Sequence, residues 1–250
     1  MIGRYDIARE CDCNARGALP ISVMKFGLLA LVVALIAFNP TSIFAQRALP
    51  EQEDEEAREE ANELAKEVWR ASGGENWSKV RELRFTCHVE QDGKEISRAE
   101  HEWKTRDSSV RVTWNGKVVV VHLLTPPQDE DGKAAFARWT DDSWWLLAPL
   151  KLLDYGVKLD YEGRKKSEGV EYETARVRFE VGLKTDDQYL LYIDPKTEMV
   201  RAWDYIPKAG NVVHGTSEKY ETFGGLKLAT EHNFDGKKMR FTDIEVKTGD

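Results

Sequence analysis

The residues of this chain that could do chemistry are scattered, and none of them forms a known catalytic signature. There is no serine in a G-x-S-x-G turn, no H-E-x-x-H pair, no phosphate-cradling glycine loop and no dinucleotide fingerprint. The five histidines lie far apart in the sequence: His88, His101, His122, His214 and His232. We therefore expect no catalytic residue and no enzyme activity of a recognised class.

Two doublets, His101-Glu102 and Asp186-Asp187, resemble pairs of metal ligands. Adjacent residues of a strand point to opposite faces, so neither doublet can chelate an ion unless it lies in a turn. We predict no metal site and no cofactor. Cys87 alternates along one face with Leu83 and Phe85, which indicates a buried and unreactive thiol.

Four aromatic residues are the candidate ligand-binding residues: Trp103, Trp114, Trp203 and Tyr205. Aromatic walls offer a large apolar area at a small cost in conformational entropy, so these side chains could line a cavity for acyl chains. The alternative is that they fill an ordinary core, because most buried aromatic side chains simply pack.

An export signal is expected at residues 24–45. Lys25 precedes an uncharged apolar run of 13 residues from Phe26 to Phe38, and Ile43-Phe44-Ala45 offers a cleavage site. The run is shorter than the roughly 18 to 20 residues that span a bilayer. We expect residues 1–23 to be a non-native extension, and residues 46–250 to form a single soluble periplasmic domain without a transmembrane segment.

The expected mature chain is acidic. Residues 46–250 carry 32 basic and 41 acidic side chains, a net charge of −9 with histidine neutral. This balance argues against nucleic acid as a partner. Cys87 is the one cysteine in this range, so an intramolecular disulfide cannot stabilise the domain and a packed core must do so.

The elements that must position these residues are one helix followed by many strands. Apolar residues recur at helical spacing from Ala57 to Trp69, and Gly73-Gly74 follows as a C-cap. Alternating patterns and turn signals, of which Asn115-Gly116 is the strongest, then predict about a dozen strands joined by short turns. The strands are expected near residues 81–90, 95–104, 110–114, 117–124, 157–161, 170–181, 189–193, 199–206, 217–223, 226–234 and 238–247.

Short turns between consecutive strands favour an antiparallel meander. Val118–Val121 and Tyr189–Ile193 are apolar at every position, so both faces of these strands should be covered. Between the two groups of strands, Ala134–Trp139 is expected as a short helix and Ser143–Pro149 as an apolar stretch that ends at the proline. The fold class is therefore mainly β (α+β), a curved antiparallel sheet around an apolar interior.

Several motifs resemble a known family. They are Ala71-Ser72-Gly73-Gly74 with Trp77, the segment from Trp144 to Leu152, the run from Asp187 to Thr197, and Phe223-Gly224-Gly225-Leu226. This order is similar to that of the LolA-like periplasmic proteins that sort outer-membrane lipoproteins. The resemblance implies an unclosed β-barrel with helices covering its concave side.

The same resemblance implies a non-enzymatic protein that holds a lipid or the acyl chains of a lipoprotein in an apolar cavity. Envelope proteins are the second class of partner, because the fold also serves as a sensor module. Two alternatives stay open: a sensor or protein-interaction domain whose cavity is filled by its own helices, and an enzyme whose polar site is assembled from separate strands. The sign of an enzyme would be a pocket in which histidine and carboxylate side chains converge.

Overall fold

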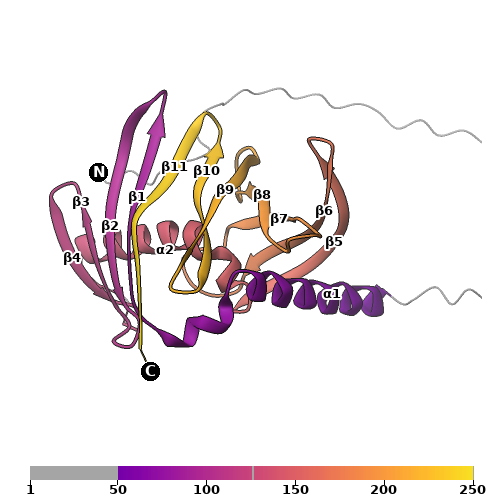
Figure 1. Cartoon of the computed structure of the whole chain (residues 1–250), viewed down its shortest axis with the longest axis horizontal. Coiled ribbons are helices and arrows are strands. Elements are labelled where there is room, and N and C mark those ends of the chain that lie inside the picture. The colour runs from indigo at the N-terminus through magenta and orange to yellow at the C-terminus, as the bar shows by residue number, and fades with distance from the viewer. Residues whose placement is uncertain (1–49, 126, 250) are drawn as a thin grey trace, which may run out of the picture.

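The computed structural model describes residues 50–125 and 127–249, which form one eleven-stranded sheet and three helices (Figure 1). The strand order is β4-β3-β2-β1-β11-β10-β9-β8-β7-β6-β5, and every pair is antiparallel. The strands are β1 (Val80–Gln91), β2 (Lys94–Lys104), β3 (Ser109–Trp114), β4 (Lys117–His122), β5 (Val157–Ser167), β6 (Val170–Phe179), β7 (Gln188–Ile193), β8 (Val200–Ile206), β9 (Val213–Phe223), β10 (Leu226–Phe234) and β11 (Lys237–Thr248).

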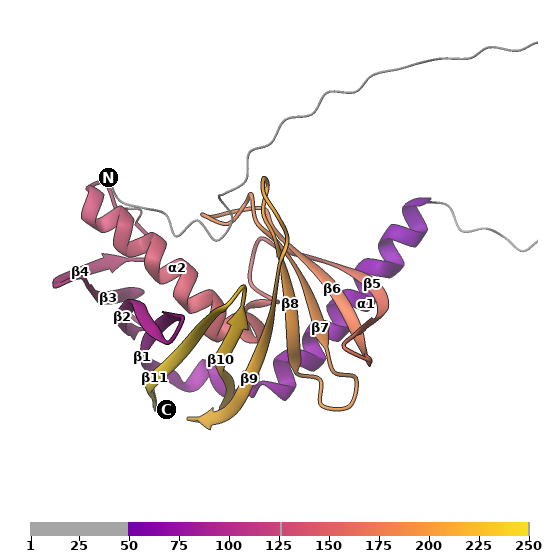
Figure 2. The ribbon, with the colours of Figure 1, turned by 90° about the horizontal axis from the view of Figure 1, so that it is seen from above.

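The sheet is two meanders joined at the centre. Strands β1 to β4 run outward to one edge, β5 to β11 return from the other, and β1 pairs with β11. Because β4 and β5 do not pair with each other, the curved sheet stays open. Helix α2 (Glu130–Lys151) lies on its concave side and helix α1 (Pro50–Ala71) lies beside β5 (Figure 2). The predicted fold class, an unclosed barrel with helices, is confirmed.

The end of α1 is fixed to the sheet by a close backbone approach. Gly73 has a left-handed φ of 76°, and a Cβ atom there would lie 2.0 Å from the carbonyl oxygen of Gly225. A short 3-10 helix, η1 (Gly74–Lys79), follows, and the Lys227 amide donates to the Ser72 carbonyl at 2.9 Å. Gly73-Gly74 therefore lies against Gly224-Gly225, and there is no room for a side chain at position 73.

The Asn115-Gly116 hairpin is confirmed. Asn115 has φ 48° and Gly116 has φ 72°, as a two-residue turn of the mirror-image type requires. The turn joins β3 to β4 with Trp114 opposite Lys117.

Residues 134–139 are helical as expected, but the predicted helix is too short and its separation from the apolar stretch at 143–149 is wrong, because both belong to the single helix α2. Asp129 caps this helix, its side chain accepting from the Gly132 amide at 2.8 Å. Pro149 lies in the last turn, where it removes one hydrogen bond near the end instead of breaking the helix. Pro149 therefore does not mark the end of the helix, which continues to Lys151.

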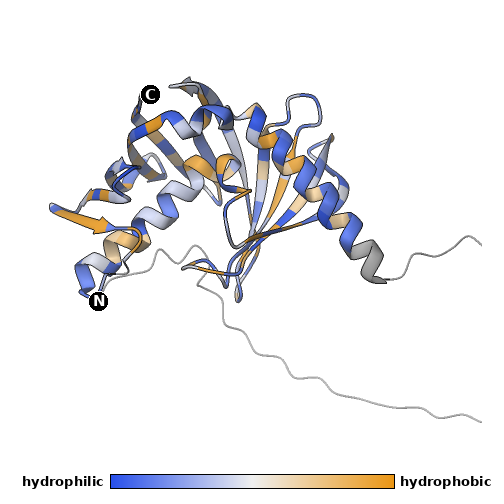
Figure 3. Cartoon of the chain, turned by 90° about the horizontal axis from the view of Figure 1, so that it is seen from below, coloured by the Kyte–Doolittle hydropathy of each residue, from blue (hydrophilic) through white to orange (hydrophobic). Residues whose placement is uncertain are grey.

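The expectation that both faces of Val118–Val121 are covered is also wrong. Val118 is 58% exposed and Val120 is 54% exposed, whereas Val121 is buried. The reason is that β4 is an edge strand with α2 on one face only, visible as the apolar strand at the end of the sheet in Figure 3. The same expectation is confirmed for β7, where Leu190 and Leu191 are both buried.

Within residues 50–125 and 127–249, none of the helices is long and apolar enough to cross a membrane.

Candidate ligand-binding interior

Helix α2 fills the concave side of the sheet with tryptophan. The ring of Trp145 lies 4.4 Å from that of Trp203 and 5.6 Å from that of Tyr189, measured between centroids. Trp144 lies 5.0 Å from Phe179 and 5.2 Å from Tyr189. Offset and edge-on contacts of this kind are favourable beyond their buried area. These five rings form the first aromatic cluster.

A second aromatic cluster lies toward the other end of the sheet. Trp139 of α2 is 5.0 Å from Trp103 of β2, and Trp103 is 5.5 Å from Trp77 of η1. Phe85 is 6.0 Å from Trp139 and 5.8 Å from Phe241. The chain of rings then continues to His232, 5.9 Å from Phe241, and so joins the first cluster.

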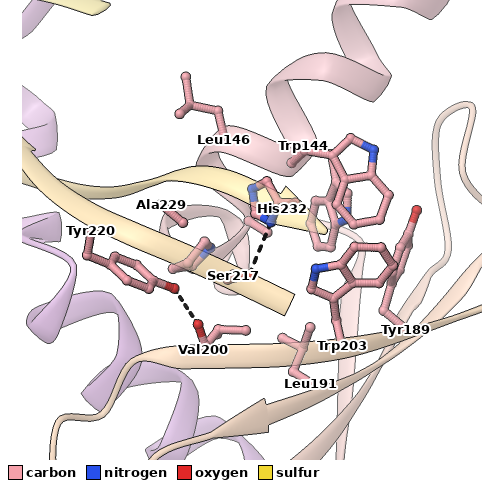
Figure 4. A pocket seen from close by; sticks show the side chains of 13 residues that line it. Trp144, Leu146, Tyr189, Leu191, Val200, Trp203, Ser217, Tyr220, Ala229 and His232 are labelled. Atoms are coloured by element: carbon pink, nitrogen blue, oxygen red, sulfur yellow. Dashed lines mark hydrogen bonds between the residues drawn. The ribbon is translucent and has the colours of Figure 1, made fainter. Parts of the chain in front are cut away.

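A small cavity lies within the first cluster, between α2 and strands β7 to β10 (Figure 4). Its volume is about 20 Å³, against roughly 300–1,000 Å³ for ordinary ligand pockets. It is lined by Trp144, Trp145, Leu146, Ala148, Pro149, Tyr189, Leu191, Val200, Trp203, Ser217, Tyr220, Ala229 and His232. With His232 neutral, none of these lining residues is charged at neutral pH, so the lining suits an apolar or uncharged ligand.

The structure brings two of the four predicted residues together. Trp203 is buried and lines the cavity, and Tyr205, half-buried two residues along β8, lies 5.4 Å from Tyr189. Trp103 belongs to the second cluster, and Trp114 packs against the core at the hairpin without lining the cavity. Their role in binding a ligand stays a prediction.

Sequence reasoning missed Trp144, Trp145 and His232 as lining residues. The adjacent pair of tryptophans inside an apolar run was an available signal, because such a run must be buried on some face. His232 gave no signal, since a histidine on an alternating strand is equally compatible with either face.

His232 is a buried polar side chain in this apolar place. Its Nδ1 lies 3.2 Å from the Thr216 carbonyl oxygen and 3.2 Å from the Ser217 hydroxyl. Burial lowers the pKa of His232 to about 4, although the Thr216 and Trp145 backbones favour the protonated form. The imidazole is therefore neutral at pH 7.

A buried polar cluster attaches α2 to the sheet. His101 Nε2 lies 2.8 Å from Asp142 Oδ2, and Arg138 Nε donates to the same oxygen at 2.6 Å. Burial opposes ionisation of Asp142, but Arg138 and His101 outweigh it and hold the pKa of that carboxyl below its usual range. Nearby, Cys87 is fully buried, and burial together with Asp142 raises the pKa of its thiol, as expected for an unreactive cysteine.

A second ion pair attaches the middle of α2 to the loop before β7. Lys184 Nζ donates to Asp141 Oδ1 at 2.8 Å and to the Tyr189 hydroxyl at 3.3 Å. Burial alone would lower the pKa of Lys184, but Tyr189, Asp141 and Asp187 raise it on balance. Helix α2 is thus held by apolar contacts along one face and by two polar clusters.

Histidine and carboxylate do converge at His101 and Asp142, but their side chains are 0% and 6% exposed, and they line neither this cavity nor the polar groove between β6 and β9. A substrate could not reach them without opening the fold. In the described ranges, there is also no group of three or more His, Cys, Asp or Glu side chains that could hold a metal ion.

A larger groove of about 780 Å³ runs between β6, the β7–β8 turn and β9. Its lining mixes both charges, with Glu171, Asp194 and Glu218 beside Lys196 and Arg201. Such a wall is hydrated and does not suit an acyl chain. The aromatic interior is therefore the better candidate for the expected ligand.

No family model and no curated protein matches this chain. Among solved structures, a LolA superfamily protein from Nitrosomonas europaea has 9% identity and a TM-score of 0.49, over 74% of this chain and 94% of that one. A DUF1329 family protein from Desulfovibrio piger has 10% identity and a TM-score of 0.48, over 77% and 94%. The chain is similar in fold to LolA-like proteins. At this identity the likeness concerns architecture alone, so the ligand of this protein must be argued from its own residues.

Proposed function

We propose that this protein binds the apolar part of a lipid, or the acyl chains of a lipoprotein, in the space between the concave face of its sheet and helix α2. The observation that supports this most directly is the continuous aromatic lining, contributed by α2 and by strands from both meanders. An apolar wall with few polar groups is what acyl chains require. We further propose that the protein is exported to the periplasm and carries out no chemistry.

The cavity of about 20 Å³ is too small for an acyl chain, so loading requires α2 to move away from the sheet. The two polar clusters of α2, at Asp142 and at Asp141, are the contacts that would have to yield. In this proposal the structure corresponds to the unloaded and closed form.

A second candidate is favoured by the same small cavity. If α2 never leaves the sheet, the interior is a self-filled core and the domain acts through its surface as an interaction or sensor module. The two candidates differ in one measurable property, which is whether the protein ever contains lipid.

Native mass spectrometry of the protein purified from its own envelope tests the proposal. A bound species of lipid mass that is released by mild activation supports lipid binding. The matched test in solution is uptake of the neutral fluorophore N-phenyl-1-naphthylamine, competed by oleyl compounds. If the spectrum shows only the mass of the protein and the fluorophore is not taken up, lipid binding is contradicted. The interaction module is then the remaining candidate.

A further inference from the structure

Strands β8 and β9 are paired over only part of their length. Their register stops at Ala202–Thr216, although β9 continues to Phe223 and pairs with β10 to its end. Lys219, in the part of β9 beyond this register, has a left-handed φ of 50°, which is not a strand conformation. In the described range 217–223, β9 therefore has no ladder of backbone pairs to β8.

A tyrosine side chain spans this gap between β8 and β9. The Tyr220 hydroxyl donates to the Val200 carbonyl oxygen (Figure 4). The guanidinium of Arg201 lies 5.4 Å from the centre of the Tyr220 ring. One hydrogen bond and one cation–π contact thus take the place of the ladder. A side chain can leave such a position by changing its rotamer, whereas a ladder opens only when a strand moves.

The gap separates the aromatic cavity from the polar groove. Val200 and Tyr220 line the cavity. Their neighbours in the chain, Arg201 on β8 and Lys219 on β9, line the groove. Ser217 lines both spaces. The wall between the cavity and the groove is therefore one residue thick at this place, and the side chain of Tyr220 closes it.

The groove offers charges of both signs. Lys196 and Glu171 line it, and their charged groups form no ion pair with another residue in the described ranges. A lipid phosphate is bound by a cationic side chain, and a lipid ammonium group by a carboxylate. The groove therefore suits a head group that carries both charges better than one that is anionic or uncharged.

We infer that Tyr220 is the gate through which a lipid with a zwitterionic head group enters the protein. The acyl chain passes between β8 and β9 into the aromatic interior, and the head group stays in the groove, its phosphate near Lys196 and its ammonium group near Glu171. Ala148 and Pro149 of α2 line the cavity that the chain enters, so the movement of α2 makes the room for it. The inference rests on the proposed lipid binding and adds the entry route and the class of head group.

The gate is tested by the rate at which N-phenyl-1-naphthylamine is taken up in a stopped-flow instrument. Tyr220→Phe keeps the ring but removes the hydroxyl that joins β9 to β8. Uptake should become about two- to tenfold faster, which is the effect of one hydrogen bond lost from the closed form. Arg201→Gln removes the cation over the ring and should also accelerate uptake, so it serves as the test if Tyr220→Phe does not fold.

The matched control for the gate is Tyr192→Phe. Tyr192 lies on β7, its hydroxyl donates to Asp204, and it lines neither the cavity nor the groove. This variant loses a hydrogen bond of the same kind, and it should take up the fluorophore at the wild-type rate.

The head group is tested with three lipids that share one oleoyl chain: lysophosphatidylethanolamine, lysophosphatidylglycerol and monoolein. Each displaces the fluorophore below its critical micelle concentration. The zwitterionic lipid should act at about tenfold lower concentration than the other two, because it alone can contact both charges. Lys196→Ala and Glu171→Ala should reduce this preference. Lys94→Ala, which removes an exposed lysine outside the groove, should keep it.

Wild-type uptake rates in both Tyr220→Phe and Arg201→Gln would overturn the gate, and so would an equal acceleration in Tyr192→Phe. Equal displacement by the three lipids would overturn the head-group site. Each of these results leaves lipid binding intact, since the fluorophore still enters. If the wild type takes up no fluorophore, the proposed function fails and the inference fails with it.

Discussion

At the scale of single residues, His232 is the group whose protonation should control stability. An unfolded histidine binds its proton near pH 6.5, whereas burial lowers the pKa of His232 to about 4 in the fold. Between these values the unfolded state holds more protons, so this contribution to stability is complete above pH 6.5 and is lost as the pH falls toward 4. The free energy of unfolding should fall by about 3 kcal/mol over this range.

Urea denaturation at pH 7, 5.5 and 4 measures this slope for the wild type and for His232→Phe. The variant should lose about 3 kcal/mol less than the wild type between pH 6.5 and 4, and it should keep the loss due to carboxyl groups such as Glu162 and Asp142, whose pKa the fold lowers. His122→Gln, which removes an exposed histidine, is the matched control and should follow the wild type. A His232→Phe curve parallel to that of the wild type would contradict the assignment.

Gly116 tests the turn between β3 and β4. A Cβ atom at this position would have no neighbour within 4 Å, so the cost of Gly116→Val comes from the positive φ of 72° alone. The loss of unfolding free energy should be about 1 to 3 kcal/mol. Gly116→Asn should cost less, because asparagine tolerates this conformation. Equal melting temperatures for wild type and Gly116→Val would show that the turn adopts another geometry.

At the scale of elements, the contacts that hold α2 on the sheet should determine both the stability of the fold and the rate at which a ligand enters. Asp142→Asn keeps the shape of the side chain but removes the charge that Arg138 and His101 contact. The unfolding free energy should fall by about 2 to 4 kcal/mol, and uptake of N-phenyl-1-naphthylamine should become faster because α2 is held less firmly.

Asp131→Asn is the control, because Asp131 also lies on α2 but its ion pair, with Lys117 of β4, is exposed. It should change stability by less than about 0.5 kcal/mol and leave the uptake rate unchanged. Uptake by Asp142→Asn at the wild-type rate would mean that this cluster does not restrain the opening of α2.

The edge strand β4 should tolerate charge on one face only. Val120→Lys places the charge in water, because Val120 is 54% exposed, and should change stability by less than about 0.5 kcal/mol. Val121→Lys places it under α2, where Val121 is 3% exposed, and should cost about 3 kcal/mol or more. Thermal melts of the two variants compare the faces directly. Similar losses in both would show that the outer face of β4 is covered.

At the scale of the whole molecule, export is the prediction that concerns the N-terminal part of the chain, which lies outside the described residues. We expect cleavage after Ala45, so that the mature protein begins at Gln46. N-terminal sequencing of protein recovered from the periplasm measures this. A chain that retains Met24, or one that carries a lipid at its N-terminus, would contradict the proposed location.

The sequence alone determined most of the strands, because alternation and turn chemistry are local. The Asn115-Gly116 hairpin, the buried Cys87 and the covered strand β7 all follow from residues close together in the chain. The predicted strands correspond to the eleven observed, with ends that differ by up to six residues, the largest difference being at the end of β5. The open barrel with helices was suggested by the family motifs, not by the alternation itself.

Only the tertiary structure decided which surfaces are covered. Val118 and Val120 are apolar, as Leu190 is, yet they are exposed because β4 ends the sheet. The pairing of β1 with β11 likewise joins residues that are far apart in the chain. The same is true of the interior: Trp203 meets Trp145, and His232 becomes buried beside them, because α2 lies across the concave face. The local pattern gives the same prediction for β4 and for β7, and the two strands differ only because β4 ends the sheet and has α2 on one face.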